Sequence, residues 1–204
     1  MAKLFLVRHG KSEWNKLGQW TGWTDVSLAE EGHIEARRAG EALQGEDIHK
    51  AYTSMLKRTH ETFEGIRQGL GMLSLSHTSH EPLNERDYGV HTGKNKWQVK
   101  EEVGEEEFQR IRRGWDVPIL DGETLKDVYT RVIPFYTEQI LADLWRGENV
   151  LIVSHGNTLR ALIKHLDDLD EIQICDVEVE TGEVHCYLFD ESGKVVGKEV
   201  RHSK

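Results

Sequence analysis

Two short, uninterrupted apolar runs constrain the fold of this chain more than any other feature: residues 4–7 near the start and residues 150–153 in the last third. Runs of this length are typical of strands that are buried on both faces, as in a parallel sheet. Residues 51–53 predict a third, shorter strand. Residues 184–189 and 195–200 alternate better between apolar and polar side chains, which predicts more edge-like strands.

Helices are expected between these strands. Ser27 and Glu30 form a capping-box pattern, so a helix should run from there to about Leu43. Another helix is expected over residues 57–70. Strands that alternate with helices predict an α/β fold: a three-layer αβα arrangement built on a mostly parallel, doubly wound sheet.

Two further helices are expected in the second half of the chain. Thr124 and Asp127 give a weaker capping box before a longer helix, in which Pro134 is the candidate for a kink. Apolar residues at helical spacing after Asn157 predict a short helix with one buried face.

Residues 74–121 break the rhythm of strands and helices. They are polar, carry few periodic apolar positions and lie between two strand–helix units. Long irregular insertions in compact proteins often serve as lids or binding loops. The Glu-rich stretch 101–107 is expected to be a solvated helix face rather than a site. With 204 residues, no repeat and no low-complexity linker, the chain is expected to form one domain over residues 1–204 with this insertion as a lid.

Composition excludes several classes of partner. The formal net charge of −10 makes nucleic acid and anionic membranes poor partners, and an anionic small molecule needs a local concentration of basic residues. The first apolar run is too short for a signal peptide, and no apolar run has the length of a membrane span. The two cysteines, Cys175 and Cys186, match no metal spacing and are expected to be free thiols in a reducing cytoplasm.

The strongest functional signal is that both apolar runs end in the same way. The first runs into Arg8-His9-Gly10 and the second into Ser154-His155-Gly156. Ligands in open α/β sheets bind beyond the carboxyl ends of the strands, so His9 and His155 are expected to face one crevice. A single histidine of this kind is more often a core residue, but two at equivalent strand ends favour a functional role. The following helix N-termini suit phosphate.

Arginine adds to this pocket. Arg58 should open the helix that follows the third strand, at the same edge of the sheet. Arg8 and Arg58 with the two histidines would form an anion pocket, since guanidinium groups match phosphate oxygens. His77 and His80 are spaced i, i+3, but no further ligand set accompanies them, so metal binding is disfavoured there.

These residues resemble the histidine phosphatase superfamily, and within it the cofactor-dependent phosphoglycerate mutases. Arg-His-Gly alone is a weak signal, but the ordered set of matching segments is specific and extends from residue 3 to about residue 190. The matching segments are residues 6–15, 21–23, 52–58, 83–89, 95–96, 112–115 and 155–162.

The resemblance implies interconversion of 3-phosphoglycerate and 2-phosphoglycerate, without a metal and with 2,3-bisphosphoglycerate as primer. His9 would be the nucleophile that carries the phosphoryl group. Arg8, Arg58 and protonated His155 would hold its oxygens, and Glu85 would be the general acid/base. The resemblance implies these substrate contacts: Asn15, Thr21, Gly22, Arg58, Arg86, Asp87, Tyr88, Lys96, Arg112, Arg113, Gly156 and Asn157. The insertion and the tail 199–204 would form the lid.

Four departures from the family pattern stand out. Lys11 replaces the usual glutamate and would add a cation near the phosphate pocket. Residues 90–94 replace a more apolar run, and residues 180–185 lack a proline and add Glu183. The connection 115–123 is short, which leaves a monomer and a dimer both open.

Two rival functions remain. A phosphatase of the same superfamily would use the same His9 with water as acceptor, and retention of Glu85, Lys96 and the Arg112-Arg113 pair argues for the mutase. A non-catalytic phosphate-binding module would be expected to have lost one of the catalytic residues, all of which are present.

Overall fold

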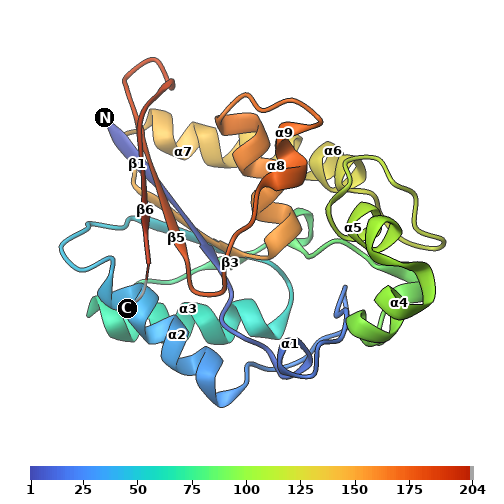
Figure 1. Ribbon diagram of the computed structural model, residues 1–204. Helices are drawn as coiled ribbons and strands as arrows, with labels where there is room; N and C mark the ends of the chain where they lie inside the picture. The colour runs from blue at the N-terminus through green and yellow to red at the C-terminus, as the bar shows by residue number, and fades with distance from the viewer. Residues whose placement is uncertain (203–204) are drawn as a thin grey trace.

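A computed structural model describes residues 1–202 and places six strands in one mixed sheet (Figure 1). The strands are β1 (Ala2–Arg8), β2 (Lys50–Thr53), β3 (Thr78–Ser79), β4 (Val150–Ser154), β5 (Val184–Phe189) and β6 (Val195–Arg201). Their order is β3-β2-β4-β1-β5-β6. The first four in this order are parallel, whereas β5 and β6 pair antiparallel at one edge. The prediction of a mostly parallel sheet is confirmed.

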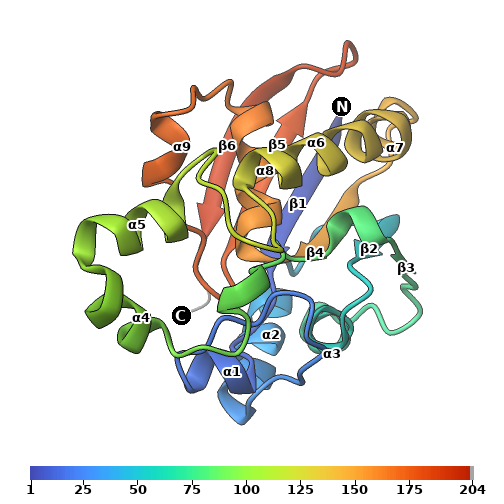
Figure 2. The same ribbon diagram turned by 90° about the vertical axis from the view of Figure 1, so that its right-hand side faces the viewer.

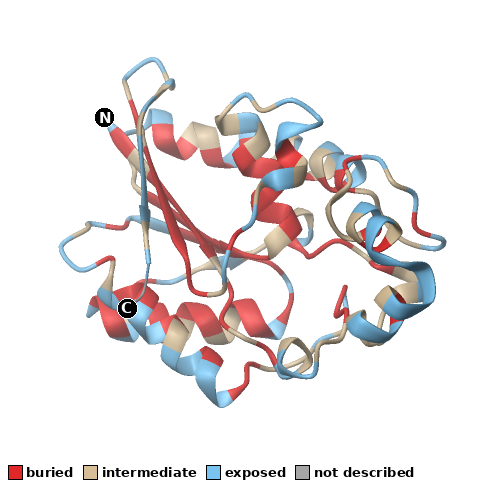
Figure 3. Ribbon diagram, viewed as in Figure 1, coloured by how far each residue is buried: buried red, intermediate tan, exposed pale blue. Residues whose placement is uncertain are grey.

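Helices cover both faces of the sheet, as the view in Figure 2 shows. One face carries α2 (Glu30–Glu41) and α3 (Lys57–Leu70), and the other carries α6 (Leu125–Phe135), α7 (Leu141–Trp145) and α8 (Gly156–Leu166). Alternate side chains of β1 pack against the helix layers on opposite faces of the sheet. Leu4 and Leu6 pack with α6 and α8, while Phe5 and Val7 pack with α2 and α3. Both sides of β1 are therefore buried (Figure 3), which explains its uninterrupted apolar run.

The predicted capping box at Ser27 is wrong. Helix α2 begins at Glu30, and its N-cap residue Ala29 makes no side-chain hydrogen bond. The Leu28 amide instead donates to the Glu61 carboxylate of α3 at 2.7 Å, which keeps this segment extended. The box of Thr124 and Asp127 at the start of α6 is confirmed, with both reciprocal hydrogen bonds present.

Helix α6 changes geometry next to Pro134. It ends at Phe135 and continues as the π-helical turn η3 (Tyr136–Ile140) into α7. Proline lacks an N–H group, and its ring collides with the carbonyl four residues earlier. The wider turn that follows is the local departure expected at Pro134.

The insertion is more regular than its sequence suggests. It holds β3, the 3-10 turns η1 (Glu81–Leu83) and η2 (Gly89–His91), and the helices α4 (Lys96–Val103) and α5 (Glu105–Arg113). A small apolar cluster stabilises it, made of Trp20, Tyr88, Val99, Phe108, Ile111 and Ile119. The prediction of an irregular segment is therefore wrong for residues 96–113, because few but well-placed apolar residues suffice for two short helices. The Glu-rich stretch is an exposed helix face, as expected.

Two short helices complete the fold, α1 (Glu13–Lys16) and α9 (Gln173–Asp176). The predicted lid at the C-terminus is contradicted for residues 199–201. They belong to β6, where Glu199 pairs with Cys186 and Arg201 pairs with Val184. Residues 203–204 lie outside the described residues. Within residues 1–202, the helices are all too short or too polar to cross a bilayer.

Candidate active site

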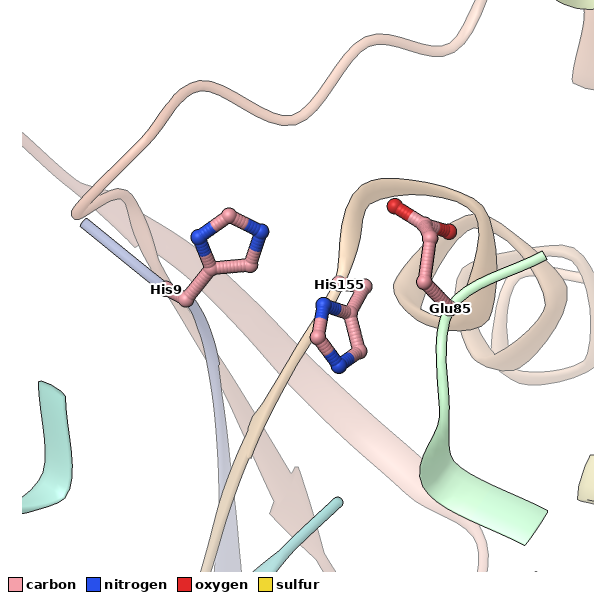
Figure 4. A group of neighbouring side chains, drawn as sticks. All are labelled: His9, Glu85 and His155. Atoms are coloured by element: carbon pink, nitrogen blue, oxygen red, sulfur yellow. The ribbon is translucent and has the colours of Figure 1, made fainter. Parts of the chain in front are cut away.

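The two histidines lie side by side because β1 and β4 are parallel neighbours. The register pairs Arg8 with Ser154, and the His9 amide donates to the Ser154 carbonyl at 2.9 Å. The ring centroids of His9 and His155 are 4.9 Å apart, and both side chains are buried. Figure 4 shows them at the ends of their strands, with Glu85 joining from a separate segment.

The hydrogen bonding of His9 fixes its tautomer. Its Nδ1 lies 2.7 Å from the Gly10 carbonyl oxygen, so Nδ1–H donates and the lone pair is left on Nε2. Burial, followed by the charges of Arg58 and Arg8, lowers the pKa of His9 well below its usual range. His9 therefore presents an uncharged, nucleophilic Nε2 at neutral pH.

Gly10 lets this segment approach α2. A Cβ atom at Gly10 would lie 2.2 Å from the carbonyl oxygen of Gly32, and one at Gly32 would lie 2.2 Å from the carbonyl oxygen of Lys11. Two glycines therefore permit a direct backbone contact beside the nucleophile.

His155 has one free ring nitrogen. Its Nε2 lies 2.8 Å from the Ser54 hydroxyl oxygen, while the buried Nδ1 has no hydrogen-bond partner within residues 1–202. Burial, then the charges of Arg58 and His9, lowers the pKa of His155 well below its usual range. The expectation of a protonated His155 thus does not hold for the free protein, because buried imidazole beside a guanidinium loses its charge.

Arg58 lies beneath the histidines. It is the second residue of α3, and its guanidinium donates to the carbonyls of Gly22 at 2.9 Å and Thr24 at 3.0 Å. Burial lowers its pKa to about 10, so it stays charged at neutral pH. Its buried Nε has no protein partner among the described residues.

The carboxylate of Glu85 is oriented by backbone and side-chain donors. Its Oε1 accepts from the Arg86 amide at 2.8 Å and from both the amide and the Nδ2 of Asn157 at 3.3 Å. Polar atoms of Glu85, His9 and His155 all lie within 4.8 Å of one another. This trio combines one carboxylate, which can act as acid or base, with two imidazoles. Carboxylates and imidazoles are also common metal ligands. Metal-free chemistry therefore stays a prediction.

A cavity opens next to this trio, with Glu85 in its wall, whereas His9, His155 and Arg58 are not among the residues that line it. Eight of the residues expected in the site form its wall: Arg8, Glu85, Tyr88, Lys96, Arg112, Arg113, Gly156 and Asn157. Lys96 is the first residue of α4, and Arg112 and Arg113 end α5, so the insertion supplies three of the five cationic side chains of the wall. Burial and the nearby charges of Arg8 and Arg112 lower the pKa of Lys96 to about 8.

Four wall residues were not expected: Trp20, Arg160, Glu178 and Val179. Arg160 lies in a segment that matches the family, and it supports the site by donating to the Asn157 side chain at 2.9 Å and to the Arg113 carbonyl at 2.8 Å. Nothing in the sequence around Glu178 distinguishes it from the other acids of its loop.

Three expected substrate contacts are themselves absent from the cavity wall and make structural contacts instead. Asn15 forms a capping box with Ser12 in α1. The Arg86 guanidinium stacks 4.6 Å from the centre of the Tyr88 ring, and it donates to the carbonyl of Ile111 at 2.9 Å. The side chain of Asp87 accepts from the Gly89 amide at 2.8 Å.

Thr21 and Gly22 also lie behind the wall. The Thr21 hydroxyl is buried without a partner among the described residues, and Gly22 takes a φ of 53° that favours glycine. The Lys11 side chain is likewise absent from the cavity wall, and the Lys11 amide donates to the Glu35 carboxylate of α2 at 2.7 Å. The extra cation near the phosphate pocket therefore stays a prediction.

The sequence matches the family model described as histidine phosphatase superfamily (branch 1) over residues 4–200. The chain belongs to the histidine phosphatase superfamily. Curated relatives of this superfamily member include a 2,3-bisphosphoglycerate-dependent phosphoglycerate mutase from Parvibaculum lavamentivorans, 43% identical over 97% of this chain and 95% of the relative. A phosphoglycerate mutase from Schizosaccharomyces pombe is 43% identical over 97% of this chain and 94% of the relative.

Solved structures of the superfamily share the fold. The Bacillus stearothermophilus protein YhfR superposes with a TM-score of 0.81 at 28% identity, covering 96% of this chain and 94% of its own. A mycobacterial glucosyl-3-phosphoglycerate phosphatase superposes with a TM-score of 0.82 at 20% identity, over 99% and 98% of the two chains. This second likeness shows the fold alone.

Proposed function

We propose that this protein is a 2,3-bisphosphoglycerate-dependent phosphoglycerate mutase that interconverts 3-phosphoglycerate and 2-phosphoglycerate through phosphorylated His9. One observation carries the proposal: the nucleophilic Nε2 of His9 lies beside His155 and Glu85, and Glu85 lines a cavity whose wall also holds Arg8, Lys96, Arg112 and Arg113. Relatives that bear this name cover nearly the whole chain at 39–44% identity.

His9 acts as the carrier of the phosphoryl group. Its Nε2 attacks phosphorus in line with the departing oxygen, so an N–P bond forms as the P–O bond breaks. Arg8, Arg58 and His155 surround this position with donors, and Arg8 Nε, Arg58 Nε and His155 Nδ1 are buried without hydrogen-bond partners in the part of the chain that the structure describes. Buried donors of this kind suit an incoming phosphoryl group, which would satisfy them and favour protonation of His155.

Glu85 handles the proton of the substrate hydroxyl. As phosphate leaves His9 for a hydroxyl, the Glu85 carboxylate accepts the hydroxyl proton, and it returns that proton when the transfer reverses. Its Oε1 is held by Asn157 and the Arg86 amide, which leaves the other oxygen available.

Bound 2,3-bisphosphoglycerate supplies the first phosphoryl group to His9. The cavity fits so anionic a primer because Arg8, Lys96, Arg112 and Arg113 converge on it from different elements. We assign the end of the ligand away from His9, with its carboxylate or second phosphate, to the Arg112–Arg113 pair and Lys96.

The decisive experiment is a coupled enolase assay on the purified protein with 3-phosphoglycerate and a trace of 2,3-bisphosphoglycerate. Formation of 2-phosphoglycerate is expected. Release of inorganic phosphate as the main product would instead identify a phosphatase that uses His9 with water as acceptor. A chelator such as EDTA is expected to leave the rate unchanged, and a loss that Zn²⁺ or Mn²⁺ restores would contradict the metal-free mechanism.

The nucleophile is tested separately. Labelled 2,3-bisphosphoglycerate should leave an acid-labile, alkali-stable phosphate on the wild-type protein. His9→Ala should accept no label, because no other imidazole nitrogen occupies its position. Label retained on that variant would move the nucleophile elsewhere.

Cellular location and assembly state complete the proposal. We assign the protein to the cytoplasm, in keeping with its two free cysteines, and expect one domain that works as a monomer or dimer. Light scattering after size-exclusion chromatography distinguishes the two assembly states.

A further inference from the structure

The carboxylate of Glu178 occupies the arginine pair at the cavity wall. One oxygen, Oε2, lies 2.6 Å from Arg113 Nη2, and the other, Oε1, lies 3.2 Å from Arg112 Nη2. A single carboxylate thus bridges both guanidinium groups. This is the arrangement that an anionic group of a ligand would need to adopt at the same place.

The backbone holds Glu178 in this position from both sides. Arg113 Nη1 donates to the carbonyl of Val177 at 3.2 Å, and Arg8 Nη1 donates to the carbonyl of Val179 at 2.6 Å. The loop between α9 and β5 is therefore fastened to two arginines of the cavity on either side of Glu178. The fastened backbone therefore holds the Glu178 carboxylate at the cavity wall.

Glu178 is ionised but easily displaced. Burial raises its pKa, yet the hydrogen bond from Arg113 and the charges of Arg113 and Arg112 outweigh burial and lower it overall. About half of the side chain, 52%, is exposed, so a displaced carboxylate passes directly into water. Exposed ion pairs contribute little net stability, and an anionic ligand with better geometry can replace this one.

We propose that Glu178 is a specificity-determining residue that competes with the ligand's carboxylate or phosphate for Arg112 and Arg113. It lowers the affinity of the site for anions, and it does so most for the ligand with the most negative charge. The identity of these ligands rests on the proposed function, whereas the competition at the arginine pair does not.

The test compares wild type with Glu178→Gln, which keeps the shape of the side chain and removes its charge. Calorimetric titration with 2,3-bisphosphoglycerate should show affinity higher by roughly three- to tenfold, the range for two partly exposed ion pairs. The gain for 3-phosphoglycerate should be smaller, and both gains should shrink as salt screens the charges. In turnover, KM should fall without a rise in kcat, as expected for uniform binding.

Glu107→Gln is the matched control. Glu107 lies on α5, the helix that also carries Arg112 and Arg113. It pairs with Arg110 at 2.7 Å and is absent from the cavity wall. It makes the same change in net charge, so its ligand affinities should equal those of wild type. An equal gain in this control would reduce the effect to overall charge and overturn the proposal.

Equal or weaker binding by Glu178→Gln would also overturn it, because Glu178 would then support the arginines instead of competing for them. The titrations need no turnover. A wild-type protein without mutase activity would therefore defeat the proposed function while the titrations still decide the role of Glu178.

Discussion

At the scale of single residues, burial lowers the pKa of several basic side chains at the site. His9 and His155 are uncharged at neutral pH, and the pKa of Lys96 is lowered to about 8 by burial and by Arg8 and Arg112. Arg58 remains charged with a pKa of about 10. The positive charge of the free protein at this site thus comes from arginines and from one lysine, which loses its charge at mildly alkaline pH.

Lys96 should set the alkaline limit of activity. It is cationic below its pKa and neutral above it, so kcat/KM for 3-phosphoglycerate should fall above about pH 8, by up to tenfold for each further pH unit. Lys96→Arg should move that limit to higher pH because a guanidinium stays charged. Lys96→Met should lower kcat/KM at pH 7 and remove the limit, and a profile identical to wild type would show that Lys96 does not contact the substrate. The measurement is initial rate against pH.

At the scale of elements, α6 holds the segment that carries Glu85. Arg131 of α6 donates to the backbone carbonyls of Pro82 at 2.7 Å, Asn84 at 3.1 Å and Glu85 at 2.9 Å, and it pairs with Glu123 at 2.7 Å. One guanidinium therefore fastens the segment before Glu85 to the helix layer. We therefore expect Arg131 to be a positioning residue that acts through Glu85.

Arg131→Met should lower kcat by about 10- to 100-fold, because small misplacement of a catalytic group is costly. It should also lower the free energy of unfolding by about 2–4 kcal/mol, since Glu123 and three carbonyls lose a charged donor. Arg131→Lys should recover only part of both losses, as one ammonium cannot reach all four acceptors. KM close to wild type is expected, and a change confined to KM would contradict a role through Glu85.

The layer of α2 and α3 depends on glycines at their contact. A Cβ atom at Gly40 would lie 2.2 Å from the carbonyl oxygen of Ile66, and one at Gly69 would lie 2.1 Å from the carbonyl oxygen of Arg37. The two helices therefore meet backbone to backbone. Their separation fixes where α3 presents Arg58.

Gly40→Ala should destabilise the protein by about 1–3 kcal/mol, because overpacking outweighs the gain of about 1 kcal/mol in helix propensity. Glu41→Ala, at an exposed position of the same helix, should change stability by less than about 0.5 kcal/mol. Urea denaturation followed by circular dichroism gives both values. A Gly40→Ala variant more stable than wild type would show that the helices separate without cost.

At the scale of the whole molecule, the buried histidines couple stability to pH. The folded state holds His9 and His155 with pKa values well below 6.5, whereas the unfolded chain protonates them near that pH. Between the two pKa values the unfolded state binds more protons, so stability falls as pH decreases below about 6.5.

The midpoint temperature of unfolding should therefore decrease as pH falls from 7 to 5. This decrease should be larger than in a variant that lacks one of the two histidines. His155→Gln keeps a polar side chain without a titrating ring, and its midpoint should fall less steeply with pH. Saturating phosphate should raise the wild-type midpoint at pH 6, because a bound anion stabilises the protonated imidazoles. Parallel slopes for wild type and variant would remove His155 from this coupling. Scanning calorimetry measures each midpoint.

The sequence by itself determined the buried strands and the strand ends at which the two histidines of the site lie. Two apolar runs, one followed by Arg-His-Gly and the other by Ser-His-Gly, predicted two buried strands that end at one crevice. The structure pairs these strands, with Arg8 opposite Ser154. These features depend on local patterns of burial, which one short segment carries in full. The cap of Thr124 and Asp127 is equally local, and it was predicted for the same reason.

Tertiary structure alone decided which partner each charged side chain takes. Helix α2 starts late because Leu28 bonds to Glu61 from α3, and the Lys11 amide donates to the Glu35 carboxylate of α2 at 2.7 Å. Glu178 reaches Arg112 and Arg113 from 65 or more positions along the chain. Burial and long-range pairing set these charges, and no local pattern in the sequence records either one.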